Sequence, residues 1–279
     1  MQQVNIIGPG RVGRTLMALV SGAPDYEVGD VYSATPASAI AATAAIGTGR
    51  AVSHLKDMGP ADIWILSVPD DQIGHVAQDL AQHLDSAAPP RVAMHCSGFL
   101  PSSVLAPLRD LGWPIASCHP VLSFADPLIA KQQFPGTCCA IEGTEDAVPV
   151  VTELVAAIEG IPFTINADNK AIYHAAAVFS NNFTTVLQAI AREAWAESGV
   201  PDDIARKLGD TLLRGTSESV ARLGPAGALT GPAARGDTSV LHVQEEKVAD
   251  WHPDAAQLYA MLSQMARRLK EHGTTQTQD

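Results

Sequence analysis

Four polar side chains in this sequence are of the types that move a proton or hold a reacting oxygen. They are Ser97, His119, Lys170 and His174. Hydride transfer to a carbonyl or imine needs a proton donor at the reacting oxygen or nitrogen, and polar groups that orient the substrate. Serine, histidine and lysine can serve both needs, so we treat these four residues as candidate catalytic residues and ask which elements position them.

Lys170 and His174 lie four residues apart at the start of a segment with helical periodicity. This spacing places both side chains on one face of a helix, and Asn181 lies about three turns further along the same face. The surrounding residues are mostly Ala, Val and Phe, so a polar face favours a site. Either Lys170 or His174 could supply the proton. The alternative is an exposed lysine at the helix start and a histidine packed in the core.

Ser97 and His119 each follow a segment that is predicted to be a strand. Open α/β sheets bind ligands beyond the carboxyl ends of their strands, and a histidine there can shuttle the proton of a reacting hydroxyl. The alternative is that His119 only caps a turn. His95 ends the strand before Ser97, and we expect it to support the substrate side of the site rather than to react.

A glycine-rich loop near the start of the chain is the strongest binding motif. It follows the apolar run 4–7 and opens the helical pattern 11–20, and it reads Gly8-Pro9-Gly10-Arg11-Val12-Gly13. Between a strand and a helix, this spacing binds a dinucleotide pyrophosphate. The first glycine makes the tight turn, the second admits the pyrophosphate, and the third lets the helix pack on the strand. We therefore expect a dinucleotide here.

The end of the second predicted strand favours NADP over NAD. Sites for NAD usually carry an acidic residue there for the ribose 2′-hydroxyl, whereas this chain has Ser33 and Thr35 and no carboxylate. Together with Ser38, these hydroxyls can donate to a 2′-phosphate. No arginine lies in this turn, so Arg11 in the glycine loop is the nearest cation.

Strands and helices alternate along the first 166 residues. Strands are predicted at 4–7, 28–33, 51–52, 62–68, 91–95, 115–118, 138–141 and 162–165, with helices at 11–20, 37–46 and 73–84. This alternation predicts an α/β fold, with an N-terminal doubly wound Rossmann domain over residues 1–166. The helical patterns 168–198, 202–223 and 253–272 predict an all-helical C-terminal domain over residues 167–279.

A Gly/Pro-rich segment, 224–237, separates the last two predicted helices. Loops of this composition either connect helices or close a site. Arg235 in this segment could clamp a substrate carboxylate with two hydrogen bonds, or it could pair with Asp237. We place Arg235 and Asn181 with His95 among the candidate substrate-binding residues.

Composition excludes several classes of function. The 279 residues are 46% hydrophobic and 17% charged, with a net charge of −12 and no basic stripe, so nucleic acid and anionic membrane are poor partners. The four cysteines lack C-x-x-C spacing, which predicts reduced thiols and no metal site. No apolar run reaches the ~18 residues of a membrane span, and the first strand leaves no room for a signal peptide. We expect a soluble, cytoplasmic protein.

With these residues placed, the chain resembles the superfamily of 6-phosphogluconate dehydrogenase, β-hydroxyacid dehydrogenases, ketopantoate reductase, pyrroline-5-carboxylate reductase and prephenate dehydrogenase. In that superfamily a Rossmann domain precedes a helical domain that usually builds a dimer. Residues 62–69 look like the fourth strand of the superfamily, whose end borders the cofactor ribose. The resemblance therefore implies that Val68 and Pro69 join the cofactor site.

The resemblance also bears on the candidate catalytic residues. β-Hydroxyacid dehydrogenases carry a Lys-x-x-x-Asn pattern where this chain has Lys170 and His174. Prephenate dehydrogenases carry a serine after one strand and a His-Pro pair after the next, at nearly the spacing of Ser97 and His119-Pro120. The chain departs from that pattern at Leu122-Ser123, where a glycine is expected.

A more specific resemblance is to Rossmann-like proteins that carry the domain of unknown function 2520. Three segments support it: His95-Cys-Ser-Gly98, Lys170 to Ala177 with Asn181-Asn182, and the run Leu229-Thr-Gly-Pro-Ala-Ala-Arg-Gly-Asp237. This resemblance spans nearly the whole chain. It implies the fold and the type of cofactor, and it implies no particular substrate.

The sequence therefore predicts an NADP-dependent oxidoreductase that acts on a small keto/hydroxy or imino acid at a cleft between the two domains. Apolar residues such as Phe179, Phe183, Val186 and Leu187 predict a homodimer through the helical domain. One alternative is an NADP-binding sensor or scaffold without catalysis. Another is an enzyme like prephenate dehydrogenase or pyrroline-carboxylate reductase. The polar residues above favour catalysis over sensing.

Overall fold

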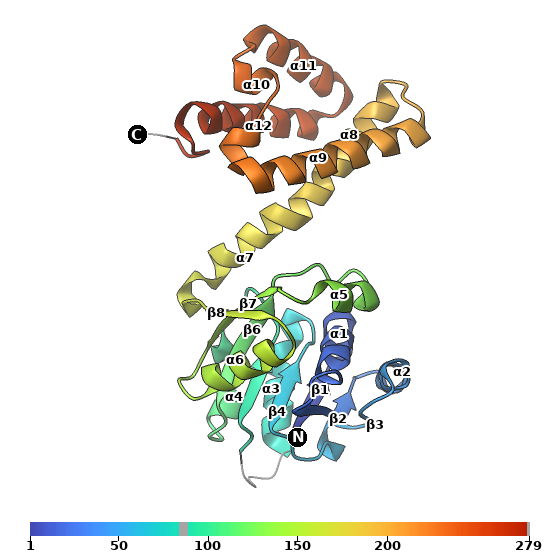
Figure 1. Ribbon diagram of the computed structural model, residues 1–279, viewed down its shortest axis with the longest axis vertical. Helices are drawn as coiled ribbons and strands as arrows, with labels where there is room; N and C mark the ends of the chain where they lie inside the picture. The colour runs from blue at the N-terminus through green and yellow to red at the C-terminus, as the bar shows by residue number, and fades with distance from the viewer. Residues whose placement is uncertain (84–88, 278–279) are drawn as a thin grey trace. The chain divides into compact units, whose positions relative to one another are not determined.

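The computed structural model describes residues 1–83 and 89–277, in two compact units, Met1–Asn181 and Asn182–Asp279. The first unit contains an eight-stranded sheet in the order β3-β2-β1-β4-β5-β6-β7-β8 (Figure 1). Its strands are β1 (Gln2–Ile7), β2 (Tyr26–Tyr32), β3 (Arg50–Val52), β4 (Ile63–Leu66), β5 (Val92–His95), β6 (Ile115–Pro120), β7 (Cys138–Gly143) and β8 (Ile161–Thr164). The first six have the strand order and parallel direction of a Rossmann domain, which confirms the predicted fold class.

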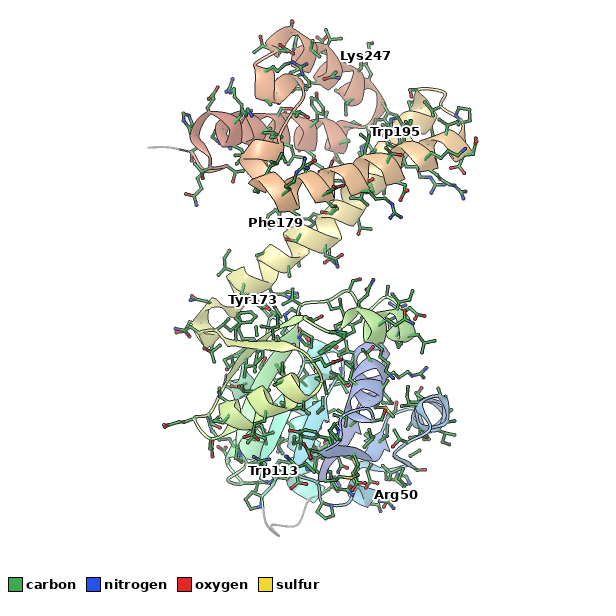
Figure 2. The ribbon with its side chains drawn as sticks, viewed as in Figure 1. Arg50, Trp113, Tyr173, Phe179, Trp195 and Lys247 are labelled. Atoms are coloured by element: carbon green, nitrogen blue, oxygen red, sulfur yellow. The ribbon has the colours of Figure 1, made fainter. Side chains whose placement is uncertain are left out.

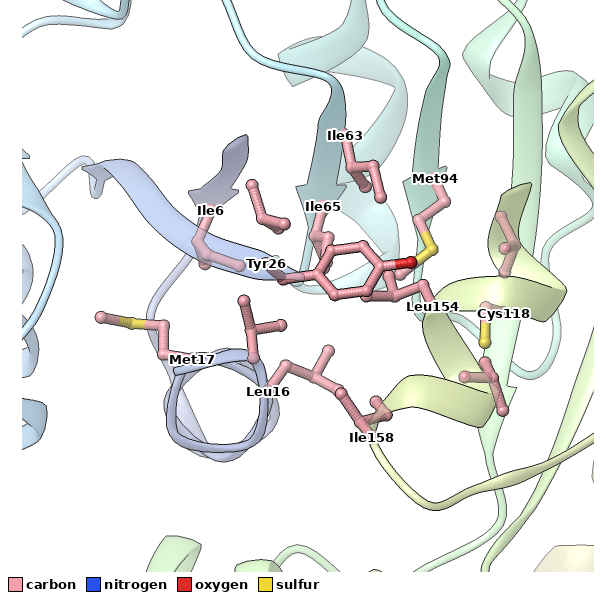
Figure 3. Close-up of a cluster of buried hydrophobic side chains, with 14 of the residues drawn as sticks. Ile6, Leu16, Met17, Tyr26, Ile63, Ile65, Met94, Cys118, Leu154 and Ile158 are labelled. Atoms are coloured by element: carbon pink, nitrogen blue, oxygen red, sulfur yellow. The ribbon is translucent and has the colours of Figure 1, made fainter. Parts of the chain in front are cut away.

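Helices cover both faces of this sheet, because each buried strand alternates its side chains between two cores. Ile6 and Ile65 face one core with α1 (Arg11–Val20) and α6 (Ala147–Ala157), as Figure 3 shows. Ile7 and Leu66, their neighbours in the chain, face the other core with α3 (Asp70–His83). The side-chain period of two along a strand produces this division.

The strand register brings three polar residues to one level of the sheet. His95 on β5 pairs with Ser117 on β6, and Ser117 pairs with Glu142 on β7. Strand β7 runs antiparallel to β6, while β8 is parallel to β7. Ile141 on β7 pairs with Cys118 on β6 and with Thr164 on β8, so β8 ends at the level of Cys118, one residue beyond Ser117, and the chain leaves the sheet there for the helical region.

The helical region departs from the predicted helix 168–198. The structure has η3 (Ala167–Asn169), α7 (Lys170–Val178), a π-helical turn η4 (Phe179–Phe183) and α8 (Thr184–Glu197). Single π-turns inside helices occur often at functional sites. The predicted domains, 1–166 and 167–279, divide after the last strand, whereas the compact units divide within this π-turn.

The second unit contains α9 (Asp202–Ala228), α10 (Pro232–Arg235), α11 (Thr238–Trp251) and α12 (Pro253–His272). The prediction of a loop over 224–237 was wrong in part. Helix α9 continues after a break at Gly224, where φ is 70°, and α10 also lies within this range. The prediction also missed α11. None of the helices in the described parts of the chain is both long and apolar enough to cross a membrane.

The remaining predicted elements agree with the structure within a few residues. Helix α1 has the predicted bounds, and α2 (Pro36–Ile46) begins one residue earlier than predicted. Helix α3 begins at Asp70 because Asp70 and Asp71 suit the positive end of a helix; the predicted end of this helix, Leu84, lies outside the described residues. The prediction named neither α5 (Pro127–Gln133) nor α6, nor the short α4 (Ala106–Arg109).

Candidate cofactor and proton-transfer site

The glycine loop closes tightly between β1 and α1. Gly8 has a φ of 86°, its N–H donates to Tyr32 O at 2.9 Å, and its oxygen accepts from Gly10 N at 2.7 Å. A side chain at Gly8 would lie 2.6 Å from Val68 Cγ1, and one at Gly13 would lie 2.5 Å from the oxygen of Gly8. A side chain at Gly10 would meet nothing within 4 Å. The loop thus has two glycines that the fold requires and one beside open space.

A cavity of about 970 Å³ lies against this loop, which is large enough for a dinucleotide portion. Of the predicted cofactor residues, seven line it: Gly8, Pro9, Gly10, Arg11, Ser33, Val68 and Pro69. Thr35 lies at the start of α2, Gly13 is buried under the loop, and Val12 packs against the core. The open space at Gly10, the helix that starts next to it and the basic residues Arg11 and Arg14 in the lining fit a pyrophosphate.

Basic side chains that the sequence prediction missed line the same cavity near Ser33 and Ser38. His54 and Lys56 lie in the segment after β3 and face the cavity with the two serines. This segment is held at both ends by Asp30, which forms a two-point ion pair with Arg50, at 2.7 Å for each contact. The same carboxylate accepts from Gly59 N at 2.6 Å. Figure 2 labels Arg50 at the edge of the first unit.

Ser97 forms the turn that follows β5. Its hydroxyl donates to Asp70 Oδ2 at 2.8 Å and accepts from the backbone N–H groups of Phe99 and Leu100, at 3.1 and 2.9 Å. Asp70 directly follows Pro69, which lines the cavity. The Ser97 turn is therefore tied to the cofactor side of the sheet. A serine hydroxyl with three partners is already engaged in fixing the turn.

His95 is fully buried beneath this turn. Its Nδ1 accepts from Ser97 N at 3.2 Å, so the proton resides on Nε2, which lies 3.2 Å from Pro101 O. Burial, together with the nearby Lys170 charge, lowers the pKa of His95 to about 4. A neutral imidazole with both ring nitrogens bonded to the turn can brace this turn, and a role of His95 toward a substrate stays a prediction.

Lys170 is 1% exposed, which removes the alternative of an exposed lysine at the helix start. Its Nζ donates to Ser97 O at 3.1 Å and to Ser117 Oγ, and it lies 3.6 Å from Glu142 Oε1. Two of these contacts are hydrogen bonds, and the third is an ion pair with a buried carboxylate. Burial lowers the pKa of Lys170, and the carboxylate of Glu142 opposes that shift. The lysine thus donates to the backbone carbonyl of Ser97 and fixes the position of this turn.

Glu142 completes this buried network. Its two oxygens accept from Ser102 N at 2.6 Å and from Ser102 Oγ at 2.8 Å. The sequence prediction missed Glu142, although one signal was present: it is a charged residue within an otherwise apolar strand, and such a residue needs a buried partner. Ser117, which donates to Ser97 O at 3.2 Å, was missed as well.

His119 lies at the end of β6 and contacts α7. Its Nδ1 is 3.0 Å from the hydroxyl of Tyr173, and its ring centroid is 5.6 Å from that of His174. Figure 2 labels Tyr173 on α7. Burial, then the neighbouring His174 and Lys170, lower the pKa of His119 to about 4, so it is neutral at pH 7. The structure therefore brings together Ser97, His119, Lys170 and His174 from β5, β6 and α7.

Asn181 and Arg235 are the two remaining predicted substrate residues. Asn181 is exposed within the π-turn. In the second unit, Arg235 pairs with Asp237 at 2.9 Å, which is one of the two interpretations given above. Any role of these two residues toward a substrate stays a prediction. Within the described residues, no group of three or more His, Cys, Asp and Glu side chains is placed to hold a metal ion.

Comparison with known families agrees with this architecture. Residues 1–120 match the model of the Rossmann-like domain, and residues 137–266 match that of the domain of unknown function DUF2520. The chain thus resembles a Rossmann-like domain followed by a DUF2520 domain. The DUF2520 match contains Glu142, Lys170, Tyr173 and His174, whereas Ser97 and His119 belong to the Rossmann-like match. The candidate site is therefore built from both.

Solved structures share this fold over almost the whole chain. A protein from Thermotoga maritima is 24% identical with a TM-score of 0.76, covering 97% of this chain and 99% of its own. A Bacteroides fragilis protein, provisionally named an NADP oxidoreductase, is 24% identical with a TM-score of 0.75, covering 96% and 98%. A Plasmodium falciparum pyrroline carboxylate reductase with NADP bound is 13% identical with a TM-score of 0.59, covering 95% and 98%. No curated protein matches the chain.

Proposed function

We propose that this protein is an NADP-dependent oxidoreductase that transfers a hydride to or from a small keto/hydroxy or imino acid. The observation that carries the proposal is the contact between the cofactor cavity and the strand-end cluster. Pro69 lines the cavity, and the next residue, Asp70, accepts from the hydroxyl of Ser97. Similarity in fold to an NADP-bound pyrroline carboxylate reductase supports the same type of cofactor.

The residues of the cluster have different roles in the proposed reaction. A bound nicotinamide would supply or accept the hydride. We assign the proton exchange to His119, with His174 beside it, because the imidazole of His119 has one ring nitrogen left for a substrate. Ser97 and Lys170 act as positioning residues, because their polar atoms are already bonded within the turn. The Gly8–Gly13 loop holds the pyrophosphate, with Arg11 beside it.

The first test concerns the cofactor. We expect the purified protein to bind NADPH at least about tenfold more tightly than NADH, because Ser33, Ser38, His54 and Lys56 all line the cavity and can donate to a 2′-phosphate. Lys56→Ala should cost about tenfold in NADPH affinity and leave NADH affinity unchanged, since a hydrogen bond to a charged group contributes about 1.5 kcal/mol or more. Fluorescence titration measures both affinities.

The matched control is Lys247→Ala, which removes an exposed lysine of the second unit that pairs only with Asp250. This variant should bind both cofactors as the wild type does. Equal NADPH and NADH affinities in the wild-type protein would contradict the cofactor assignment.

The second test concerns turnover. We expect the wild-type protein to oxidise NADPH with at least one member of a panel of α-keto acids and cyclic imino acids that includes pyrroline carboxylate. His119→Asn should lower kcat/KM by about 10²–10⁴-fold, the usual contribution of a positioned acid or base, while NADPH affinity stays unchanged. His242→Asn, at an exposed position of the second unit, is the control. A wild-type protein that binds NADPH but never oxidises it would favour the sensor alternative.

We also propose that the partner of this protein is a second copy of itself, bound through the helical region. Among the described residues of the second unit, the buried ones are alanines: Ala205, Ala255 and Ala256. Large apolar side chains remain exposed on α8 and α9, including Val186, Leu187, Leu208, Leu212 and Leu223. Exposed apolar surface of this extent marks an interface.

The third test is therefore sedimentation. We expect a dimer at micromolar concentration and a shift toward monomer in the Leu212→Glu variant, because a buried carboxylate opposes association. Lys207→Glu, an exposed change on the same helix, should stay dimeric. A monomeric wild-type protein would count against the proposal.

A further inference from the structure

Two imidazole nitrogens converge over the Cα atom of Gly98, the residue after Ser97. A methyl group at this position would lie 2.6 Å from His174 Nδ1 and 2.8 Å from His119 Nε2. The two histidines come from β6 and α7, and their rings are inclined by 75°. Within the described residues, neither imidazole is a hydrogen-bond partner of Lys170 or Glu142.

His174 Nδ1 is a buried polar atom without a partner. Among the side chains in the described part of the protein, it is the one buried nitrogen or oxygen that makes no hydrogen bond. Leaving such an atom unpaired costs free energy, and most buried polar atoms in folded proteins are paired. A polar atom of a bound molecule next to Gly98 would supply the hydrogen bond that this nitrogen lacks.

The hydrogen bond between the Tyr173 hydroxyl and His119 links the direction of that bond to the tautomer of the imidazole. Burial raises the pKa of Tyr173 to about 12, so its phenol keeps the proton at neutral pH. Among the described residues, Nδ1 of His119 is the acceptor that this hydroxyl meets, at 3.0 Å. If Tyr173 donates to Nδ1, the neutral ring must carry its own proton on Nε2. That N–H then lies beside Gly98, next to His174 Nδ1.

We propose that Tyr173 and His119 form one proton-transfer pair, and that the Nε2–H of His119 and Nδ1 of His174 together hold the reacting oxygen of a carbonyl/alcohol substrate beside Gly98. This inference rests on the proposed oxidoreductase function and makes its substrate class narrower. A carbonyl or hydroxyl oxygen has two lone pairs and can accept from both ring nitrogens when His174 carries its proton on Nδ1. An imine nitrogen has one lone pair and can meet only one of them.

In the reduction, a bound reduced nicotinamide would supply the hydride to the carbonyl carbon and be left oxidised, while the π bond of the C=O group breaks. The oxygen takes the proton from His119 Nε2 to form the alcohol, and Nδ1 takes the phenol proton of Tyr173. The phenolate that remains regains a proton from water. Oxidation of the alcohol follows the same steps in reverse. Tyr173 is a positioning and relay residue, since it acts through His119.

The pair can be tested without a known substrate. Long-range ¹H–¹⁵N NMR of the full chain labelled with ¹⁵N-histidine reports which ring nitrogen carries the proton. We expect His119 to be neutral with its proton on Nε2, and we expect Tyr173→Phe to convert it to a mixture of both tautomers. Tyr259→Phe removes a hydroxyl that donates to Gln244 in the second unit, and this control should leave the His119 signals unchanged. A proton on Nδ1 in the wild type, or unchanged signals in Tyr173→Phe, would overturn the pair.

The substrate class is tested with the panel described above. We expect turnover of α-keto acids and not of cyclic imino acids, and a loss of about tenfold or more in kcat with little change in KM for Tyr173→Phe. Turnover of cyclic imino acids alone would overturn the carbonyl assignment while leaving the oxidoreductase proposal standing. Absence of turnover with both classes would overturn the substrate assignment together with the proposed function, and the NMR result would still decide the proton-transfer pair.

Discussion

Replacing Gly13 by alanine is expected to abolish NADPH binding and to lower the unfolding temperature of the protein. The added methyl group would lie 2.5 Å from the oxygen of Gly8 and 2.6 Å from Ser67 Oγ. The Ser67 hydroxyl itself donates to that oxygen at 2.8 Å. Because backbone atoms cannot turn away as a flexible side chain can, the glycine loop must shift off the end of β1.

Overpacking of this kind costs about 1–3 kcal/mol, which corresponds to a fall of roughly 2–12 °C in the unfolding temperature of a unit of this size. Gly10→Ala is the matched control, since nothing lies within 4 Å of the added methyl group. We expect Gly10→Ala to keep the wild-type unfolding temperature and still bind NADPH more weakly, because the methyl group occupies space that the pyrophosphate needs. Thermal unfolding and fluorescence titration measure the two effects. A Gly13→Ala protein with wild-type stability would refute the steric argument.

The second large effect concerns the buried ion pair of Lys170 and Glu142, whose side chains are 1% and 7% exposed. Lys170→Met keeps the length of the side chain and removes its charge. The carboxylate of Glu142 then remains buried without a cation, and breaking a buried pair in this way costs about 3–5 kcal/mol. We expect a loss of this size in the free energy of unfolding, measured by urea denaturation.

The double variant Lys170→Met/Glu142→Leu should recover part of this loss, because neither charge is then left alone in the interior. Recovery is incomplete because Ser102 loses both acceptors that Glu142 provides. Lys247→Met breaks an exposed pair and should change stability by less than about 1 kcal/mol. Strictly additive losses for Lys170→Met and Glu142→Leu would show that the two side chains do not stabilise each other.

The glycine loop was predictable from sequence because its chemistry is local. A strand, a tight turn and a helix follow one another within twenty residues, and each glycine has a steric role that its spacing reveals. Ser97 and His119 were predictable for a related reason, since each lies at or just beyond the carboxyl end of a buried strand. Parallel strands collect such residues at one edge of a sheet. Lys170 required the additional hint of an i,i+4 polar pair on an apolar helix.

Glu142, Tyr173 and Lys56 were not predicted because their importance depends on contacts far apart in the sequence. Glu142 reaches Lys170 only because β7 runs antiparallel to β6 and pairs it with Ser117. Tyr173 looked like one more aromatic residue of an apolar helix until α7 brought it to His119. The π-turn at Phe179–Phe183 was missed because hydrophobic periodicity does not distinguish one wider turn from an ordinary helix.

The ion pair between Asp30 and Arg50 has a consequence for the entropy of cofactor binding. Ordering the backbone of a loose loop costs about 1–2 kcal/mol per residue at 25 °C. In this protein the short segment that carries His54 and Lys56 is fixed before any ligand arrives, because Asp30 binds Arg50 at one end and Gly59 at the other. Binding of a dinucleotide would then restrict little further backbone motion in this segment. Most of the favourable free energy of each new phosphate contact would therefore contribute to the affinity.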